Sequence, residues 1–66
     1  MEKHTVDTKF DETGNVETKI VEVVDFADES FCEFHVVTCD ESTGEYVETT
    51  QVFTDFDEAM KVWEAA

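Results

Sequence analysis

The chain contains no arginine and only four lysines, whereas Asp and Glu together number 18, so its formal net charge is −14 over 66 residues. Binding to nucleic acid depends mainly on cationic side chains that neutralise phosphates, so we expect no direct contact with nucleic acid. The same sign argument excludes an anionic membrane surface. No apolar run is longer than two residues, so the sequence predicts neither a membrane span nor a signal-peptide core.

Proline and leucine are both missing, and glycine occurs only twice. The chain nevertheless has 41% hydrophobic residues, six of them Phe, which is more than disordered acidic segments contain. Valine and threonine are abundant, and these β-branched residues favour a pleated sheet, while the lack of leucine argues against a helical bundle. The length and composition therefore predict that residues 1–66 form one small, strand-rich acidic domain. Its core is expected to be too thin for an enclosed active site.

Cysteine occurs only twice, which is typical of a reducing compartment and predicts a cytoplasmic location. Cys32, His35 and Cys39 have a spacing that superficially suggests zinc. On a strand, however, Cys32 points away from the other two, and a fourth ligand is missing. Neither His35 nor His4 has a recognisable nucleophile beside it, so the sequence predicts no metal, no cofactor and no enzymatic activity.

The two glycines each lie in a turn-forming cluster, residues 11–15 and 40–45, between runs rich in β-formers. We therefore expect two hairpins, joined through residues 27–30, that together form a four-stranded antiparallel β-meander. The predicted strands cover about residues 3–10, 16–26, 31–39 and 46–54.

The tail has apolar residues at helical spacing from Phe56 to Ala66, and Asp55 and Glu58 stand where a helix N-cap and its partner do. The predicted fold class is therefore α+β, with one C-terminal helix packed on one face of the sheet through Phe56, Met60 and Trp63.

Strand alternation predicts which side chains face the helix. The expected core consists of Val6, Phe10, Cys32, Phe34, Val36, Val47 and Phe53. Residues 16–26 carry apolar side chains on both sides, so their register and any bulge stay open. The opposite face would hold Phe31, Val37, Tyr46, Val52 and one member of each of the pairs Ile20-Val21 and Val23-Val24. Two interpretations of this face remain: a protein interface, or a surface that sheet twist and polar neighbours cover.

Residues 20–60 contain 12 carboxylates and no lysine or arginine, so internal ion pairs can neutralise few of them. Carboxylates two positions apart on a strand are separated by about 6.7 Å and neighbouring strands by about 4.8 Å, spacings comparable to those of backbone phosphates. Such a grid of carboxylates can present a nucleic-acid-like charge pattern to a cationic cleft. Its electrostatic potential can accelerate association with that cleft about 10–1000-fold. The alternative is that the charge only maintains solubility.

In size, charge and expected architecture, the chain resembles the small acidic DNA-mimic inhibitors of phages and mobile elements, which include anti-CRISPR and anti-restriction proteins. The resemblance implies a phage-type protein in the host cytoplasm that blocks the nucleic-acid-binding cleft of a basic protein or nucleoprotein complex. The alternative is a homodimeric structural or adaptor protein that uses the open apolar face. The predicted partner-binding residues are Glu22, Glu33, Asp40, Glu41, Glu45, Tyr46, Glu48, Asp57 and Glu58.

Overall fold

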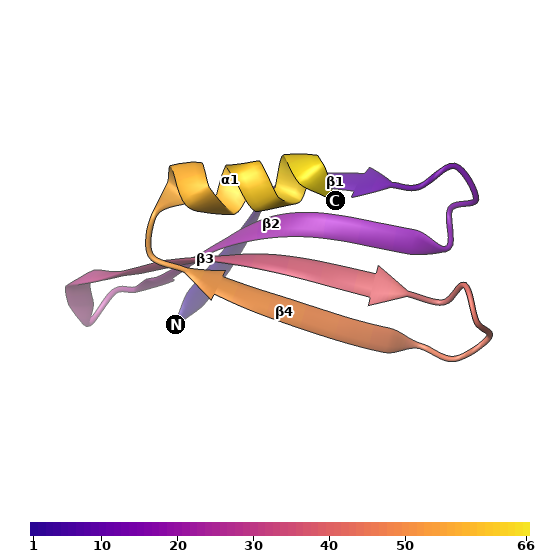
Figure 1. The fold of residues 1–66 in the computed structure, drawn as a ribbon. Helices are drawn as coiled ribbons and strands as arrows, with labels where there is room; N and C mark the ends of the chain where they lie inside the picture. Colours follow the sequence, from indigo (N-terminus) through magenta and orange to yellow (C-terminus); the bar gives the residue numbers. More distant parts are fainter.

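The computed structural model describes the backbone of residues 1–66 and every side chain except that of Glu29. The strands are β1 (Glu2–Phe10), β2 (Val16–Asp25), β3 (Asp28–Asp40) and β4 (Val47–Phe53), and they are followed by the helix α1 (Phe56–Ala65). The strands form one antiparallel sheet in the order β1-β2-β3-β4, and α1 crosses one of its faces (Figure 1). The predicted α+β meander is confirmed.

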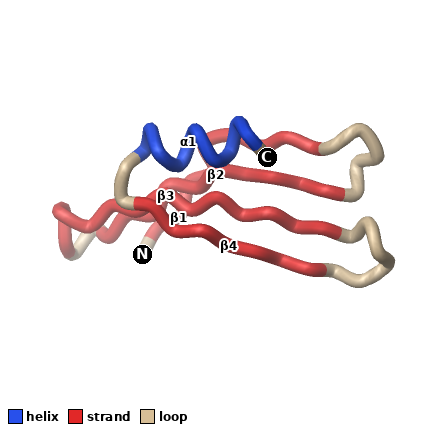
Figure 2. The backbone as a smooth tube through the Cα atoms, viewed as in Figure 1, coloured by secondary structure: helices blue, strands red, loops and turns tan.

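The connections place the β1–β2 and β3–β4 loops at one end of the molecule and the β2–β3 turn at the other (Figure 2). Gly14 and Gly44 have φ values of +76° and +87°, a left-handed conformation that glycine adopts without strain. The β2–β3 connection is shorter than predicted. Strand β3 already begins at Asp28, which pairs with Asp25, so residues 28–30 belong to a strand.

A register shift in β1 changes which of its residues face the helix. Thr5 pairs with Val21 and Asp7 pairs with Ile20, so Val6 is the extra residue of a β-bulge. Beyond the bulge the alternation is reversed, and Phe10 pairs with Glu17 on the face away from the helix. The prediction that Val6 and Phe10 belong to the core was therefore wrong: their exposed fractions are 48% and 61%.

The core lies where α1 covers the centre of β2 and β3, and it is built on Ile20, Val36 and Ala59, which are 0–3% exposed. Around it pack five partly buried side chains: Phe34, Phe53, Met60, Val62 and Trp63.

The predicted core positions Phe34, Val36 and Phe53 are confirmed, but Cys32 and Val47 are exposed. A helix of ten residues is about 15 Å long, whereas the 13 residues of β3 extend over about 43 Å, so α1 cannot cover the ends of the sheet. Phe56, predicted as core, begins the helix and is 39% exposed, although its ring packs edge-on against Phe34 at 5.2 Å.

Contacts at both ends fix α1 on the sheet. Asp55 is the N-cap, and its carboxylate accepts hydrogen bonds from the backbone amides of Asp57 and Glu58, as the sequence predicted. Near the C-terminus, Trp63 Nε1 donates to the carbonyl oxygen of Thr18 at 3.0 Å. Lys9 Nζ lies 4.7 Å from the centre of the Trp63 ring and donates to the Glu64 carbonyl at 3.3 Å. One of the four lysines is thus used to hold the helix C-terminus.

Candidate acidic interaction surface

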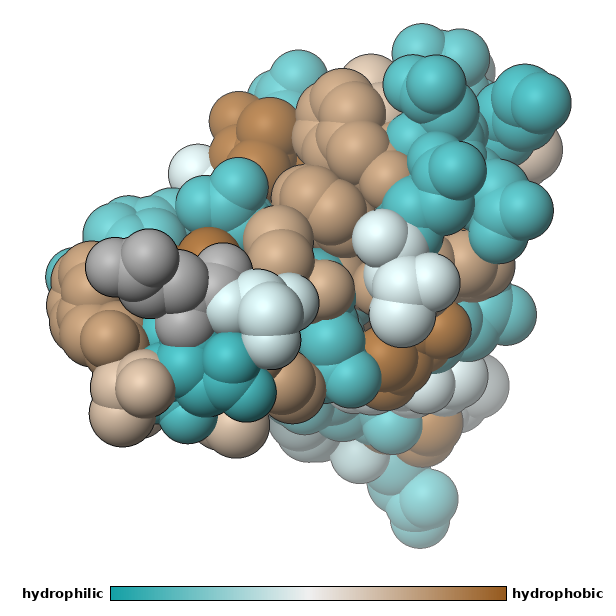
Figure 3. Space-filling model, turned by 90° about the vertical axis from the view of Figure 1, so that its left-hand side faces the viewer, coloured by the Kyte–Doolittle hydropathy of each residue, from teal (hydrophilic) through white to brown (hydrophobic). Residues whose placement is uncertain are grey.

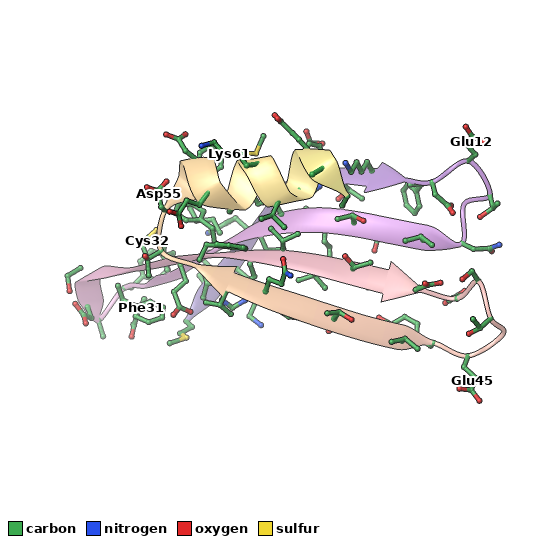
Figure 4. The ribbon with its side chains drawn as sticks, in the orientation of Figure 1. Glu12, Phe31, Cys32, Glu45, Asp55 and Lys61 are labelled. Atoms are coloured by element: carbon green, nitrogen blue, oxygen red, sulfur yellow. The ribbon has the colours of Figure 1, made fainter. Side chains whose placement is uncertain are left out.

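A concentration of acidic residues lies at the end formed by the β1–β2 and β3–β4 loops. We call it the loop-end surface, and it comprises Asp11, Glu12, Asp40, Glu41, Glu45, Tyr46 and Glu48. The two loops are in direct contact, because the backbone amide of Glu41 donates to the Asn15 carbonyl at 2.9 Å. Glu12 and Glu45 extend from the two loops at this end (Figure 4).

The two aspartates of the loop-end surface build the loops. The Asp11 carboxylate accepts hydrogen bonds from Thr13 Oγ1 and from the backbone amides of Asn15 and Val16. Local desolvation alone would raise the pKa of Asp11, but these hydrogen bonds within the loop outweigh it, and the pKa lies below its usual value.

Asp40 has the same structural role in the second loop. Its carboxylate accepts bonds from the Ser42 hydroxyl at 2.6 Å and from the Ser42 amide at 2.8 Å. These two bonds lower the pKa of Asp40, while the negative charge of nearby Asp11 acts in the opposite direction. Both loops are therefore organised around carboxylates that remain ionised at neutral pH, but whose oxygens are partly occupied.

The glutamates of the loops differ from these aspartates. Glu12, Glu41 and Glu45 are exposed, and in the described part of the chain none of their carboxylates accepts a hydrogen bond. Glutamate side chains at loop tips are therefore the groups that a partner can reach without dismantling a turn.

Tyr46 and Glu48 form a side-chain pair at the start of β4. The Tyr46 hydroxyl donates to Glu48 Oε2 at 2.7 Å and lies 3.2 Å from Cys39 Sγ. The contacts with Cys39 and then Glu48 raise the pKa of Tyr46, so its hydroxyl stays protonated and its one proton is donated to Glu48. Tyr46 is 60% exposed, which confirms the prediction that it faces outward.

The remaining predicted partner-binding residues lie elsewhere. Asp57 and Glu58 occupy the first turn of α1, at the end of the molecule opposite to the loops (Figure 1). Glu22 pairs with Phe34 on the helix side of the sheet, whereas Glu33 pairs with Val23 on the open side. The nine predicted residues therefore do not form one surface. Five of them, Asp40, Glu41, Glu45, Tyr46 and Glu48, are brought together.

Sequence reasoning did not assign Asp11 and Glu12 to the site, although it placed both in a turn. The signal was available: in a meander the first and third connections lie at the same end of the sheet, so two acidic turns must become neighbours. Asp11 and Glu12 were missed because the second turn was considered without the first turn, which lies beside it.

Hardly any of the negative charge is neutralised within the molecule. Among the described side chains, the contacts within 4.0 Å between a basic and an acidic group are His4–Glu2 at 3.6 Å and His35–Glu33 at 3.1 Å, which are ion pairs only when the histidine is protonated, and no lysine lies that close to a carboxylate. None of the described carboxylate residues is buried. The charge of −14 is therefore displayed at the surface.

The open face of the sheet differs from the loop-end surface. Lys3, Lys19 and His35 line a hollow of about 250 Å³ together with Val21, Val37, Thr5 and Glu48. Val21 and Val23 are only 7% and 2% exposed there. Lys3 and Glu33 are the cross-strand neighbours of Val23, so long polar side chains beside the valines shield them in place of a second layer.

The end of the molecule opposite to the loops has a mixed surface. At the end that carries the β2–β3 turn, hydrophobic side chains are interspersed with hydrophilic ones (Figure 3). Phe26 in this turn is 78% exposed, and Phe31 and Cys32 point to opposite sides of the sheet nearby (Figure 4). The residues that suggested zinc are thus divided between the two faces. In the described part of the chain, no three His, Cys, Asp or Glu side chains are grouped so that they could hold a metal ion.

The chain matches no protein-family model, and neither a curated protein nor a solved structure is significantly similar to it. Among the described residues no helix has the length and apolar character needed to cross a membrane. The functional argument therefore depends on the surface itself.

Proposed function

We propose that this protein is a phage-type inhibitor that binds, by its acidic loop-end surface, the basic nucleic-acid-binding cleft of a host defence or nucleic-acid-handling complex, and so blocks access of nucleic acid. It acts in the cytoplasm by occupying the cleft, without catalysis and without a cofactor. The observation that carries the proposal is that no described carboxylate has a lysine within 4.0 Å in a molecule of net charge −14.

The geometry of the loops supports this role. A carboxylate that forms an internal ion pair binds a partner less tightly, because the pair must first be broken. The glutamates of the loops form no such pair with any described side chain, so this free-energy cost does not arise. The loops are fixed by their aspartates, so the glutamates at their tips are presented with little conformational entropy left to lose in the backbone. The potential of the whole molecule attracts a cationic cleft from a distance of about 8–10 Å at physiological salt.

The test is capture of proteins from the native host on the immobilised chain at low salt, followed by elution with either DNA or RNA. We expect nucleic-acid-binding proteins to be retained and to be displaced by nucleic acid, because both occupy the same cleft. Retained proteins that nucleic acid fails to displace would contradict the proposal.

Two matched variants locate the surface. In the first, Glu12, Glu41 and Glu45 are each replaced by Gln, which removes charge at constant side-chain volume. In the second, which also removes three charges, the acidic residues of α1, Asp57, Glu58 and Glu64, are replaced by Asn, Gln and Gln. Capture should be lost in the loop-end variant and largely retained in the helix variant.

A second candidate, a homodimer that packs through the open sheet face, is favoured by the charge of that face. Its regularly paired charged residues are Lys3, Lys19, Glu17, Glu33 and Glu48, so this face carries little of the net charge. Exposed Phe10 and Val52 supply apolar surface. The outcome that supports this candidate is a dimer in sedimentation equilibrium that Val52→Glu dissociates; a monomer at all concentrations contradicts it.

A further inference from the structure

Strand β4 is an open edge without the usual protection. It is hydrogen-bonded only to β3, six of its seven residues are exposed, and its only charged residue is Glu48. The other edge, β1, is interrupted by the bulge at Val6 and carries several charges. Natural sheets block their edges with bulges, charges or proline, because an unpaired edge accepts a further strand. By this criterion β1 is protected and β4 is not.

A groove lies beside this edge on the helix side, because α1 packs over β2 and β3 and leaves β4 partly uncovered. Its volume is about 350 Å³. It is lined by Val36 and Thr38 of β3, Thr49 and Gln51 of β4, and Val62 and Ala65 of α1. The floor is therefore mostly apolar, and its outer wall is the edge strand itself.

We infer that an extended segment of a basic partner protein adds to β4 as a fifth strand, with every second side chain directed into the groove between β4 and α1. Strand addition takes its affinity from main-chain hydrogen bonds and its specificity from pockets that receive alternate side chains, and this edge offers both. A fifth strand would lie about 4.8 Å from β4, close enough for its helix-side residues to contact Thr49 and Gln51.

The position of the acidic residues determines the chemistry of the segment. Its helix-side residues should be apolar and of moderate size to fit the groove. Its residues on the other side would lie beside Glu48, and acidic residues flank both ends of β4, with Glu45 before it and Asp55 after it. Alternating apolar and basic residues complement this pattern. The charge of the segment rests on the proposed function, whereas its extended shape rests on the edge and the groove.

The same residues disfavour a second copy as the occupant. An antiparallel β4–β4 pair that uses all seven residues is centred on Thr50, and it places Glu45 of one copy opposite Asp55 of the other. Like charges that lie opposite one another across strands are destabilising, and each copy has a net charge of −14.

The probe is an eight-residue peptide that alternates lysine and valine, titrated into the full chain by calorimetry and by NMR. The control peptide has the same charge but a central proline, which cannot continue a strand. Two protein variants are matched: Thr49→Trp places a large ring on the groove side of β4, and Thr50→Trp places it on the opposite side. Both threonines are exposed, so the fold should persist, and far-UV circular dichroism checks this.

We expect the alternating peptide to bind, to slow amide hydrogen exchange in β4, and to lose about tenfold in affinity with Thr49→Trp, as expected when one apolar side chain is excluded from its pocket. Thr50→Trp should change the affinity by less than about threefold. Absence of binding, or equal effects of the two variants, would overturn the inference.

Equal affinity of both peptides without protection of β4 would show association by charge alone, which overturns strand addition but leaves the proposed function intact. A third outcome is that β4 amides are protected in the free protein at high concentration and that sedimentation shows a dimer. This result would identify a second copy of the chain as the occupant of the edge and would also overturn the inference. Failure of the proposed function is recognised separately, when nucleic acid does not displace the captured host proteins.

Discussion

Replacing Trp63 by phenylalanine should weaken the docking of α1, because it removes one hydrogen bond and weakens a cation–π contact while keeping a six-membered aromatic ring. The hydrogen bond from Trp63 Nε1 to the Thr18 carbonyl, 3.0 Å long, is lost. A bond of this kind contributes about 0.5–1.5 kcal/mol net, and leaving its acceptor unsatisfied costs about 1–3 kcal/mol. The contact of Lys9 with the ring contributes about 0.5–1 kcal/mol, and phenylalanine retains part of it.

The sum is a loss of about 1–3 kcal/mol from a domain whose expected stability is about 3–10 kcal/mol. At this size each kcal/mol changes the melting temperature by about 4–8 °C, so the variant should melt about 5–20 °C lower. Urea unfolding followed by far-UV circular dichroism measures the change in the free energy of unfolding. Fluorescence is unsuitable because the variant lacks the only tryptophan.

A double-mutant cycle with Lys9→Met separates the two contributions. The coupling energy between positions 9 and 63 should be about 0.5 kcal/mol or more, since the two side chains are in contact. A loss below about 0.5 kcal/mol for Trp63→Phe would refute the reasoning that this residue anchors the helix.

Three further predictions concern the core and the loops. Ile20→Ala, at a fully buried site, should cost about 2–5 kcal/mol in urea unfolding, enough to unfold much of the protein; a cost below about 1 kcal/mol would contradict the assigned core. Because the folded-state pKa of Asp11 is lowered, its contribution is present above its ordinary pKa and is lost as the pH falls through the lowered value. The difference in stability between wild type and Asp11→Asn should accordingly shrink below about pH 4, and a difference that is constant down to pH 2 would oppose this. Absorbance titration of Tyr46 should give a midpoint above the ordinary value of 10.0, and Cys39→Ala should lower it; an unshifted midpoint in the wild type would be evidence against the Tyr46–Cys39 contact.

Most of the fold could be predicted because its signals are local. The two glycine turns, the N-cap at Asp55 and the helical spacing of the tail each depend on a few neighbouring residues. The bulge at Val6 could not be predicted, since β1 alternates regularly as a sequence and the shift appears only when it pairs with β2. Phe10 was therefore assigned to the wrong face.

Residues 16–26 appeared ambiguous for a physical reason. Strand β2 is central and buried on both sides, with Ile20 beneath the helix and Val21 and Val23 beneath side chains of the open face. Such a strand has no polar side, so alternation could not set its register. Within residues 16–26 the structure has one register irregularity, between Val24 and Asp25 where β2 meets the β2–β3 turn, and the other shift lies in β1.

The candidate site was only partly predictable. Sequence showed how many carboxylates there are, but which of them approach one another depends on topology. It also treated Asp and Glu alike, whereas the structure uses Asp11 and Asp40 to build the loops and leaves Glu12, Glu41 and Glu45 exposed.

The central claim is that exposed, unpaired glutamates of the loop-end surface bind a cationic cleft. The most direct test measures how the affinity for a captured host protein depends on salt, for the wild type and for the chain in which Glu12, Glu41 and Glu45 are all replaced by Gln. We predict that affinity of the wild type falls steeply between about 50 and 200 mM salt and that the variant binds weakly at every salt concentration. Equal, salt-independent binding of the two proteins would contradict the claim.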